Sequence, residues 1–233
     1  MRDYFVFDGI NTQDYQMYAA NKNQFEGGGK RVETITVPGR NGTLSISDGT
    51  YENVTITYEM YCKGDIRKNL AAMRDRLGAT SGYCRLADSF EPDLFMKARY
   101  SEPFNVKGSD RKGAAADISF DCDPRRFLKS GEKTKTLTGA ASLKNPTRNE
   151  ARPLIRAYGS GTLTIGSIRV QITTANVYTD IDCEIEEAYK GSVSCNNNIV
   201  LTDGYFPVLK TGVNEISFTD FSKVEITPRW WIR

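Results

Sequence analysis

Histidine is absent from the 233 residues of this chain. It is the commonest general base near neutral pH and the commonest transition-metal ligand, so its absence weakens most enzyme and metal-site hypotheses at once. Cysteine occurs five times, an odd number without a C-x-x-C pair, which favours buried free thiols over a zinc site or disulfides. We therefore expect no catalytic residue, no metal and no organic cofactor.

Long apolar runs and an excess of one charge are also missing. No run approaches the roughly 20 residues that a membrane-spanning helix requires, and Met1-Arg2-Asp3 lacks the layout of a signal peptide. Lysine and arginine number 31 against 29 aspartates and glutamates, which leaves a formal charge of +2. We therefore expect a chain made in the cytosol, without membrane insertion and without specificity for nucleic acid.

Two turn signals stand back to back between alternating strands, in Pro38-Gly39-Arg40-Asn41-Gly42. Proline presets φ for the first turn position, glycine supplies the positive φ of the second, and Asn-Gly is the strongest short hairpin signal. The chain is expected to reverse sharply here. Arg40, held between the two turns, is expected to project from the loop.

The rest of the chain is dominated by strand patterns. Segment 50–62 alternates apolar and polar residues, whereas 65–77 has helical spacing, with Asp65 as its cap and Gly78 as its stop. Segment 129–146 is poor in large apolar residues, so the domain junction is placed there: residues 1–130 form one β domain with a helix, and 131–233 another. Short strands with regular turns predict a β-sandwich for the second domain.

Two glycine-bounded segments are interpreted as hairpin tips. Gly27-Gly28-Gly29-Lys30 lacks the glycine five positions earlier and the Ser or Thr that a phosphate-binding loop requires, because Gln24 and Arg31 hold those places. The polar stretch that contains Ser109, Asp110 and Arg111 lies between Gly108 and Gly113 and is also expected at a tip.

Two further patterns have competing interpretations. Asp180, Asp182, Glu184 and Glu186 alternate with apolar residues; we favour a solvated strand face over a calcium site or the carboxylates of a glycoside hydrolase. Trp230 and Trp231 are adjacent in a terminal strand and point to opposite faces. Packing at an interface is favoured over stacking on a sugar ring.

The turn motif PGRNG, the N-terminal FVFDGI and the closing FPVLKTGVN and ITPRW together resemble the distal tail proteins, the Dit family, of long-tailed bacteriophages and prophages. The resemblance implies a split-barrel-like β domain with one helix, followed by a galectin-like or carbohydrate-module-like sandwich. It also implies a non-enzymatic virion protein, assembled in the host cytoplasm, that forms a ring of six subunits at the end of the tail.

In that family the ring connects the tail-tube protein to the tail hub and to the receptor-binding apparatus. Family hairpins that reach a neighbouring subunit correspond here to a predicted interface set: Gly27, Gly28, Gly29, Lys30, Pro38, Gly39, Arg40, Asn41, Gly42, Ser109, Asp110 and Arg111. The alternative is a carbohydrate-binding protein that recognises a receptor through its second domain, with Trp230 or Trp231 as the stacking residue.

Overall fold

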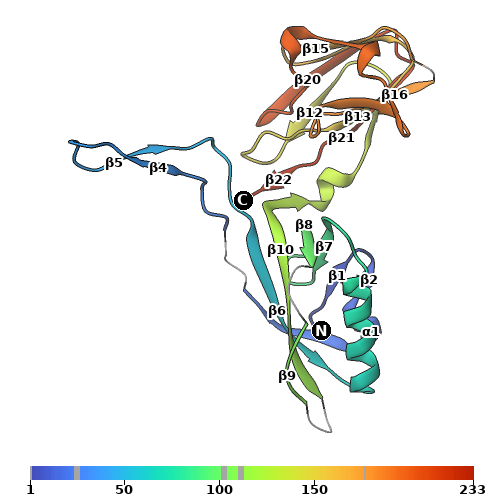
Figure 1. The fold of residues 1–233 in the computed structure, drawn as a ribbon. Coiled ribbons are helices and arrows are strands. Elements are labelled where there is room, and N and C mark those ends of the chain that lie inside the picture. The colour runs from blue at the N-terminus through green and yellow to red at the C-terminus, as the bar shows by residue number, and fades with distance from the viewer. Residues whose placement is uncertain (1, 24–26, 101–103, 110–112, 176) are drawn as a thin grey trace. The chain divides into compact units, whose positions relative to one another are not determined.

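The computed structural model describes residues 2–23, 27–100, 104–109, 113–175 and 177–233. The chain separates into two compact units, Met1–Arg126 together with Arg233, and Phe127–Ile232. We call them unit 1 and unit 2 and describe each by itself. The predicted fold class is confirmed: both units are mainly β, and the described residues contain one α-helix (Figure 1).

Unit 1 is built on one curled antiparallel sheet. Its strands follow the order β2-β1-β7-β8-β10-β6-β3, and β9 pairs beside β10. A backbone bridge between Asp3 and Ala19 links the start of the chain to β3, so the two ends of the sheet meet. The bounds are β1 Phe5–Phe7, β2 Ile10–Asn11, β3 Met17–Lys22, β6 Val54–Cys62, β7 Cys84–Asp88, β8 Leu94–Tyr100, β9 Asn105–Ser109 and β10 Ala114–Leu128.

The alternation of β6 and β10 creates the core of unit 1. Their even-numbered side chains point inward, and Tyr58 and Phe120 meet Phe5 and Phe7 of β1 in an aromatic cluster with ring centroids 4.7 to 5.3 Å apart. Such tilted and edge-on pairs stabilise a core beyond the burial of their area. The sequence predicted this alternation but missed β3, which has a bulge between Ala19 and Asn21 that interrupts its period.

Helix α1, Ile66–Gly78, packs on this core through Met73 and Leu77, which are fully buried. Asp65 caps it as expected, because its carboxylate accepts a hydrogen bond from the Lys68 amide at 3.2 Å. Gly78 is the last helical residue, but it does not adopt the left-handed conformation of a glycine stop. No helix in the described ranges is long and apolar enough to cross a membrane.

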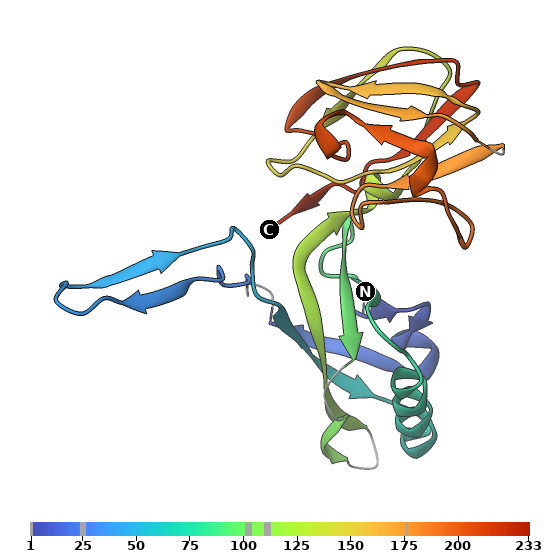
Figure 2. The ribbon, with the colours of Figure 1, turned by 45° about the horizontal axis from the view of Figure 1, so that its top comes forward.

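Strands β4, Glu33–Thr36, and β5, Thr43–Ile46, form a separate two-stranded ribbon within unit 1 (Figures 1 and 2). We call residues 29–52 the arm, because the backbone pairing continues below β4 and β5. The amide of Arg31 donates to Thr50 O at 3.0 Å, and that of Glu52 donates to Gly29 O at 2.8 Å. The arm is therefore one continuous hairpin of the chain.

Unit 2 is a sandwich of two antiparallel sheets, visible as two layers in Figure 2. The first has the order β11-β21-β13-β16-β17-β18, and the second β12-β20-β14-β15-β19. The bounds are β11 Lys135–Leu137, β12 Ala141–Asn145, β13 Leu154–Tyr158, β14 Gly161–Ile165, β15 Ile168–Ile172, β16 Tyr178–Asp182, β17 Glu187–Lys190, β18 Val193–Ser194, β19 Ile199–Leu201, β20 Gly212–Thr219 and β21 Lys223–Thr227. Strand β22, Trp231–Ile232, is part of neither sheet.

The segment in which the sequence places the domain junction is structured. It contributes β11 and β12, each at the edge of one sheet. Edge strands make contact on one side only, so their sequences need fewer large apolar residues. The chain ends beside this segment: Leu128 donates its amide hydrogen to Trp230 O at 2.8 Å, and β22 pairs the end of β10.

Candidate functional site

The tip of the arm has the Pro-Gly turn that the sequence predicts, but Asn41-Gly42 forms a bend in place of the second tight turn, because Asn41 does not adopt the positive φ of an Asn-Gly hairpin turn. Gly39 has a φ of 81° and Gly42 a φ of 80°, and the Arg40 amide donates to Val37 O at 3.2 Å. These values match a Pro-Gly turn with a left-handed second position. Arg40 is exposed, and its side chain forms no hydrogen bond or ion pair within the described ranges. The tip therefore presents one guanidinium to the surroundings.

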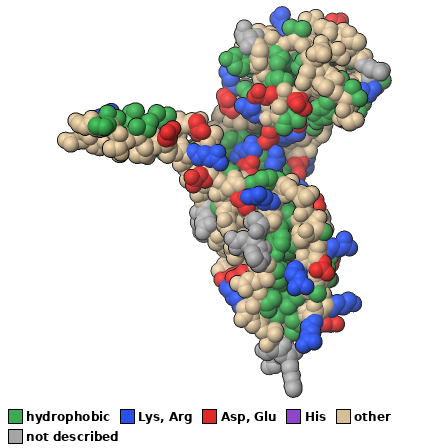
Figure 3. All heavy atoms as spheres, in the orientation of Figure 1, with side chains coloured by type: hydrophobic (Ala, Val, Ile, Leu, Met, Phe, Trp, Pro, Cys, Tyr) green, Lys and Arg blue, Asp and Glu red, His purple; other side chains and the backbone are tan. Residues whose placement is uncertain are grey.

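The arm has one apolar face and one hydroxyl face. Ile35 pairs with Leu44 and Glu33 with Ile46, so these side chains share a face with Val37, while Thr34, Thr36, Thr43 and Ser45 lie on the other. Figure 3 shows the hydrophobic side chains gathered along the arm. Ile35, Val37, Leu44 and Ile46 remain 37 to 49% exposed. This uncovered apolar face is the principal feature of the arm.

The glycine run is at the foot of the arm and not at a hairpin tip, so that interpretation was wrong. Gly29 and Lys30 pair with Glu52 and Tyr51, at the end of the ribbon opposite the turns. A glycine run marks close backbone approach as readily as a turn. Here Gly28 packs against the Glu52 backbone and Pro124, whereas Gly27 has open space around it and a Cβ at Gly29 would make only an ordinary contact with Glu52.

The second predicted tip belongs to the β9–β10 hairpin. Ser109 ends β9 and is exposed, and Asp110 and Arg111 lie outside the described residues. Within the hairpin, Lys107 forms an ion pair with Asp117 at 2.7 Å.

The predicted solvated acidic face was wrong. Asp180 and Asp182 are buried in β16, and each accepts two hydrogen bonds from one guanidinium: Arg156 for Asp180, at 2.6 and 2.9 Å, and Arg229 for Asp182, at 2.6 and 2.9 Å. The strand ends at Asp182, so Glu184 and Glu186 follow in a turn. Both buried carboxylates are committed to ion pairs within unit 2.

Those ion pairs alter the acid-base properties of the carboxylates. Burial alone raises the pKa of Asp182, but the hydrogen bonds from Arg229 and from the Glu184 amide outweigh it and hold that pKa below its ordinary value. A general acid requires the opposite shift.

Of the two tryptophans, only one retains an accessible ring. Trp230 is 4% exposed and belongs to the core of unit 2, so it cannot stack on a glycan. Trp231 is half-buried against the same core, and its indole N–H donates to Glu150 O at 2.9 Å. Both tryptophans therefore contact one core, and only Trp231 belongs to a strand, because β22 begins there.

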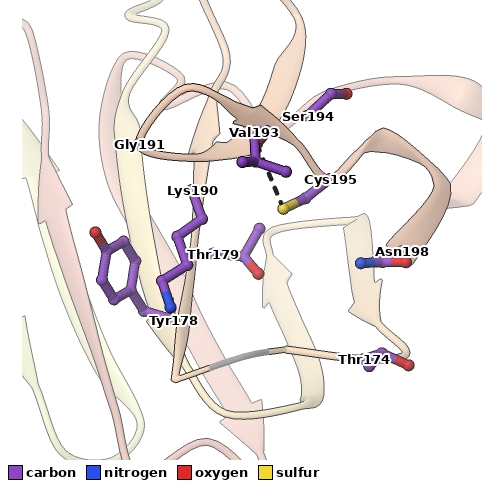
Figure 4. A pocket seen from close by; sticks show the side chains of 9 residues that line it. All are labelled: Thr174, Tyr178, Thr179, Lys190, Gly191, Val193, Ser194, Cys195 and Asn198. Carbon is purple, nitrogen blue, oxygen red and sulfur yellow. Dashed lines mark hydrogen bonds between the residues drawn. The ribbon is translucent and has the colours of Figure 1, made fainter.

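A hollow of about 520 Å³ opens on unit 2 (Figure 4). Among the described residues that line it, Lys190 is the only charged one; it lies beside Tyr178, and the Thr179 side chain lies between Lys190 and Cys195. The Tyr178 ring is in contact with two cations, Arg156 at 4.3 Å and Lys190 at 5.3 Å from its centroid. A sugar ring would have to displace one of them in order to stack there, so this hollow gives little support to glycan binding.

The buried cysteine thiols of this chain have a structural role. All five cysteines are free, and Cys62, Cys122 and Cys183 are buried. Burial raises the pKa of Cys122 to about 12 and also raises that of Cys183, which keeps both thiols protonated and unreactive. In the part of the chain that the structure describes, no three Cys, Asp or Glu side chains are grouped to hold a metal ion.

One buried cluster in unit 1 has no signal in the sequence. Lys22 is 4% exposed, and its Nζ lies 2.7 Å from both Asp88 Oδ2 and Glu91 Oε2. Tyr58 donates its hydroxyl hydrogen to Asp88 at 2.6 Å, and Arg126 donates to Glu91 at 3.0 Å. The cluster joins β3, β6, β7 and the end of β10, and its charges are mutually paired, which is typical of a structural role.

Comparison with known proteins supports the fold. No protein-family model and no curated protein sequence matches the chain. Among solved structures it matches the SPP1 Dit protein (gp 19.1), whose crystal structure is described as a paradigm of the hub adsorption apparatus in phages that infect Gram-positive bacteria. The TM-score is 0.76 at 16% identity, and the match covers 100% of both chains. The resemblance predicted from the sequence is therefore confirmed at the level of the fold.

Proposed function

We propose that this chain is a structural, non-enzymatic protein of a bacteriophage tail that forms a ring of six subunits at the distal end of the tail tube. The observation that carries the proposal is the fold match to the SPP1 Dit protein, which extends over the full length of both chains. The arm supplies a physical reason for assembly, independent of that match.

The arm is difficult to explain in an isolated subunit. A two-stranded hairpin alone is marginally stable in water, and its outer edges carry unpaired backbone groups. This arm also exposes an apolar face of four side chains. A neighbouring subunit can cover that face and pair those edges, and a head-to-tail contact repeated around a closed ring does so for every arm.

In this proposal unit 1 forms the ring and unit 2 contacts the surrounding tail proteins. The partners are a second copy of the chain, the tail-tube protein, the tail hub and the receptor-binding apparatus, and the location is the tail tip of the virion after assembly in the host cytoplasm. Arg40 at the arm tip is suited to a two-pronged hydrogen bond to a neighbouring carboxylate.

Two adjacent residues on opposite faces of the arm provide a matched test. Leu44→Asp adds a charge to the apolar face, and Ser45→Asp adds the same charge to the hydroxyl face. We expect Leu44→Asp to abolish ring formation and Ser45→Asp to retain it, with the far-ultraviolet circular dichroism of both variants unchanged. Multi-angle light scattering on the full chain, alone and mixed with its tail-tube and hub proteins, measures the assembly.

A wild-type chain that stays monomeric even in that mixture contradicts the assembly proposal. Equal assembly by the two variants would show that the apolar face is not the contact.

A further inference from the structure

The foot of the arm contains the one close backbone contact of the glycine run. A Cβ atom added at Gly28 would overlap the Glu52 carbonyl oxygen and would lie 2.8 Å from Pro124 Cβ. A Cβ at Gly27 would meet nothing within 4 Å, and one at Gly29 would make an ordinary contact at 3.7 Å with the Glu52 carboxylate. None of the three glycines has a positive φ, so Gly28 differs from the other two only in having no room for a side chain.

The next residue of the returning strand is attached by its side chain. Asn53 donates its side-chain amide hydrogens to Asp121 Oδ1, at 2.9 Å, and to the Tyr83 hydroxyl. Asp121 in turn accepts a hydrogen bond from Arg99 at 2.7 Å. The attachment of Asn53 therefore involves side chains from β8, β10 and the segment before β7.

These contacts attach the arm to β10 at two points. Gly28 lies against Pro124 and against the Glu52 backbone, and Asn53 is bonded to Asp121, three residues earlier in the same strand as Pro124. A ribbon attached at one point can pivot about it, whereas two points define a direction. The remainder of the arm, from Lys30 to Thr50, is exposed along its whole length, so these attachments at the foot determine where it points.

We propose that Gly28 is an arm-positioning residue: its missing side chain lets residue 28 pack closely against both Pro124 and the Glu52 backbone, and this packing, with the Asn53–Asp121 hydrogen bond, sets the direction of the arm. The inference rests on the proposed function, because it assigns the foot the task of presenting the apolar face to the next subunit. The same packing holds the foot of the arm in an isolated subunit, so it can be tested without assembly.

The three adjacent glycines allow identical substitutions in the full chain: Gly28→Ala as the test, and Gly27→Ala and Gly29→Ala as controls. The first measurement is hydrogen exchange of the Glu52 and Arg31 amides, which form the lowest rungs of the arm. We expect Gly28→Ala to speed both by about tenfold or more through local opening, while the controls exchange like the wild type. Core amides such as Ile118 report whether unit 1 stays folded.

The second measurement is ring assembly with the tail-tube and hub proteins. We expect it to fail for Gly28→Ala and to persist for the two controls. If the wild type does not assemble, the proposed function is wrong, and the exchange rates still decide whether Gly28 holds the foot. Gly28→Ala that exchanges and assembles like the controls overturns the inference.

Asn53→Ala tests the second attachment without adding any atom. We expect faster exchange at Glu52 with no change at Ile118, because the substitution removes the bond to Asp121 and leaves the core intact. This variant decides the question if Gly28→Ala unfolds unit 1. Exchange at Glu52 that equals the wild type would contradict the two-point attachment.

Discussion

Lys22→Met tests whether the buried cluster holds unit 1 together. Methionine keeps much of the side-chain length but removes the charge and the donors to Asp88 and Glu91. The Lys22 and Asp88 side chains are 2% and 6% exposed, so water cannot replace the lost partner. Removing one member of a buried pair typically costs about 3 to 5 kcal/mol. Because Tyr58 continues to donate to Asp88, we expect the lower end, about 3 kcal/mol.

Native-state hydrogen exchange of core amides in unit 1 measures this change. For an amide that exchanges only through unfolding of the unit, a loss of about 3 kcal/mol speeds exchange by roughly a hundredfold. Ile56 and Ile118 are suitable, since both are fully buried in central strands. The matched control is Lys107→Met, which breaks an ion pair of the same 2.7 Å separation on the surface. That control is expected to exchange like the wild type, because exposed pairs contribute little.

The pH dependence gives a second check with a definite sign. Burial opposes ionisation of Asp88, but hydrogen bonds from Lys22 and Tyr58 outweigh it and hold its pKa below the ordinary value. Its contribution is therefore complete above the unfolded pKa of about 3.9 and is lost as pH falls through the folded pKa. Without Lys22 the pKa of Asp88 rises, so the gap between wild type and variant should be largest near neutral pH and narrow in acid. A Lys22→Met variant that behaves like Lys107→Met, or a gap that does not change with pH, refutes the reasoning.

Three further predictions follow from unit 2 and from the thiols. Ellman's reagent should titrate Cys195 first and Cys84 second in the native protein, since burial and the nearby Asp8 raise the pKa of the Cys84 thiol, and all five thiols only after unfolding. Asp182→Asn should destabilise unit 2 at neutral pH, and urea midpoints should show the difference shrinking as pH falls below the unfolded pKa of about 3.9 and through the lower folded pKa of Asp182. Replacing Trp231 by alanine should lower thermal stability, while a glycan array probed with the wild-type chain should give no signal that depends on this residue.

The features that the sequence predicts well are local ones. Three such features are the alternation in β6, the cap at Asp65 and the Pro-Gly turn before Arg40, and each depends on residues within a few positions of one another. Their geometry is set by steric limits and hydrogen bonds of the segment itself, so the pattern alone is sufficient.

The features that it missed depend on partners far along the chain. Asp180 pairs with Arg156 and Asp182 with Arg229, across separations of 24 and 47 residues. The four alternating acids therefore indicated a solvated face, although strand pairing places Arg156 opposite Asp180 and the segment after β21 brings Arg229 to Asp182. Gly28 was misplaced for the same reason, because its crowding comes from Glu52 and Pro124.

The size of the arm's apolar face limits how strongly two subunits can associate. Complete burial of an aliphatic side chain is worth about 1.5 to 3 kcal/mol. Four such side chains remain 37 to 49% exposed, so covering them contributes about 2 to 5 kcal/mol for each arm. Association itself costs about 4 to 15 kcal/mol in lost translational and rotational freedom. One arm contact therefore does not hold a dimer by itself. In the proposed ring, the contact that closes the ring forms within an existing assembly and so needs no further association step, and a tube or hub that gathered the subunits would lower the association cost of each contact. The same arithmetic makes the direction of the arm decisive: a contact this small tolerates no misplacement, which is why Gly28→Ala, a change outside the apolar face, is expected to prevent assembly as Leu44→Asp does within it.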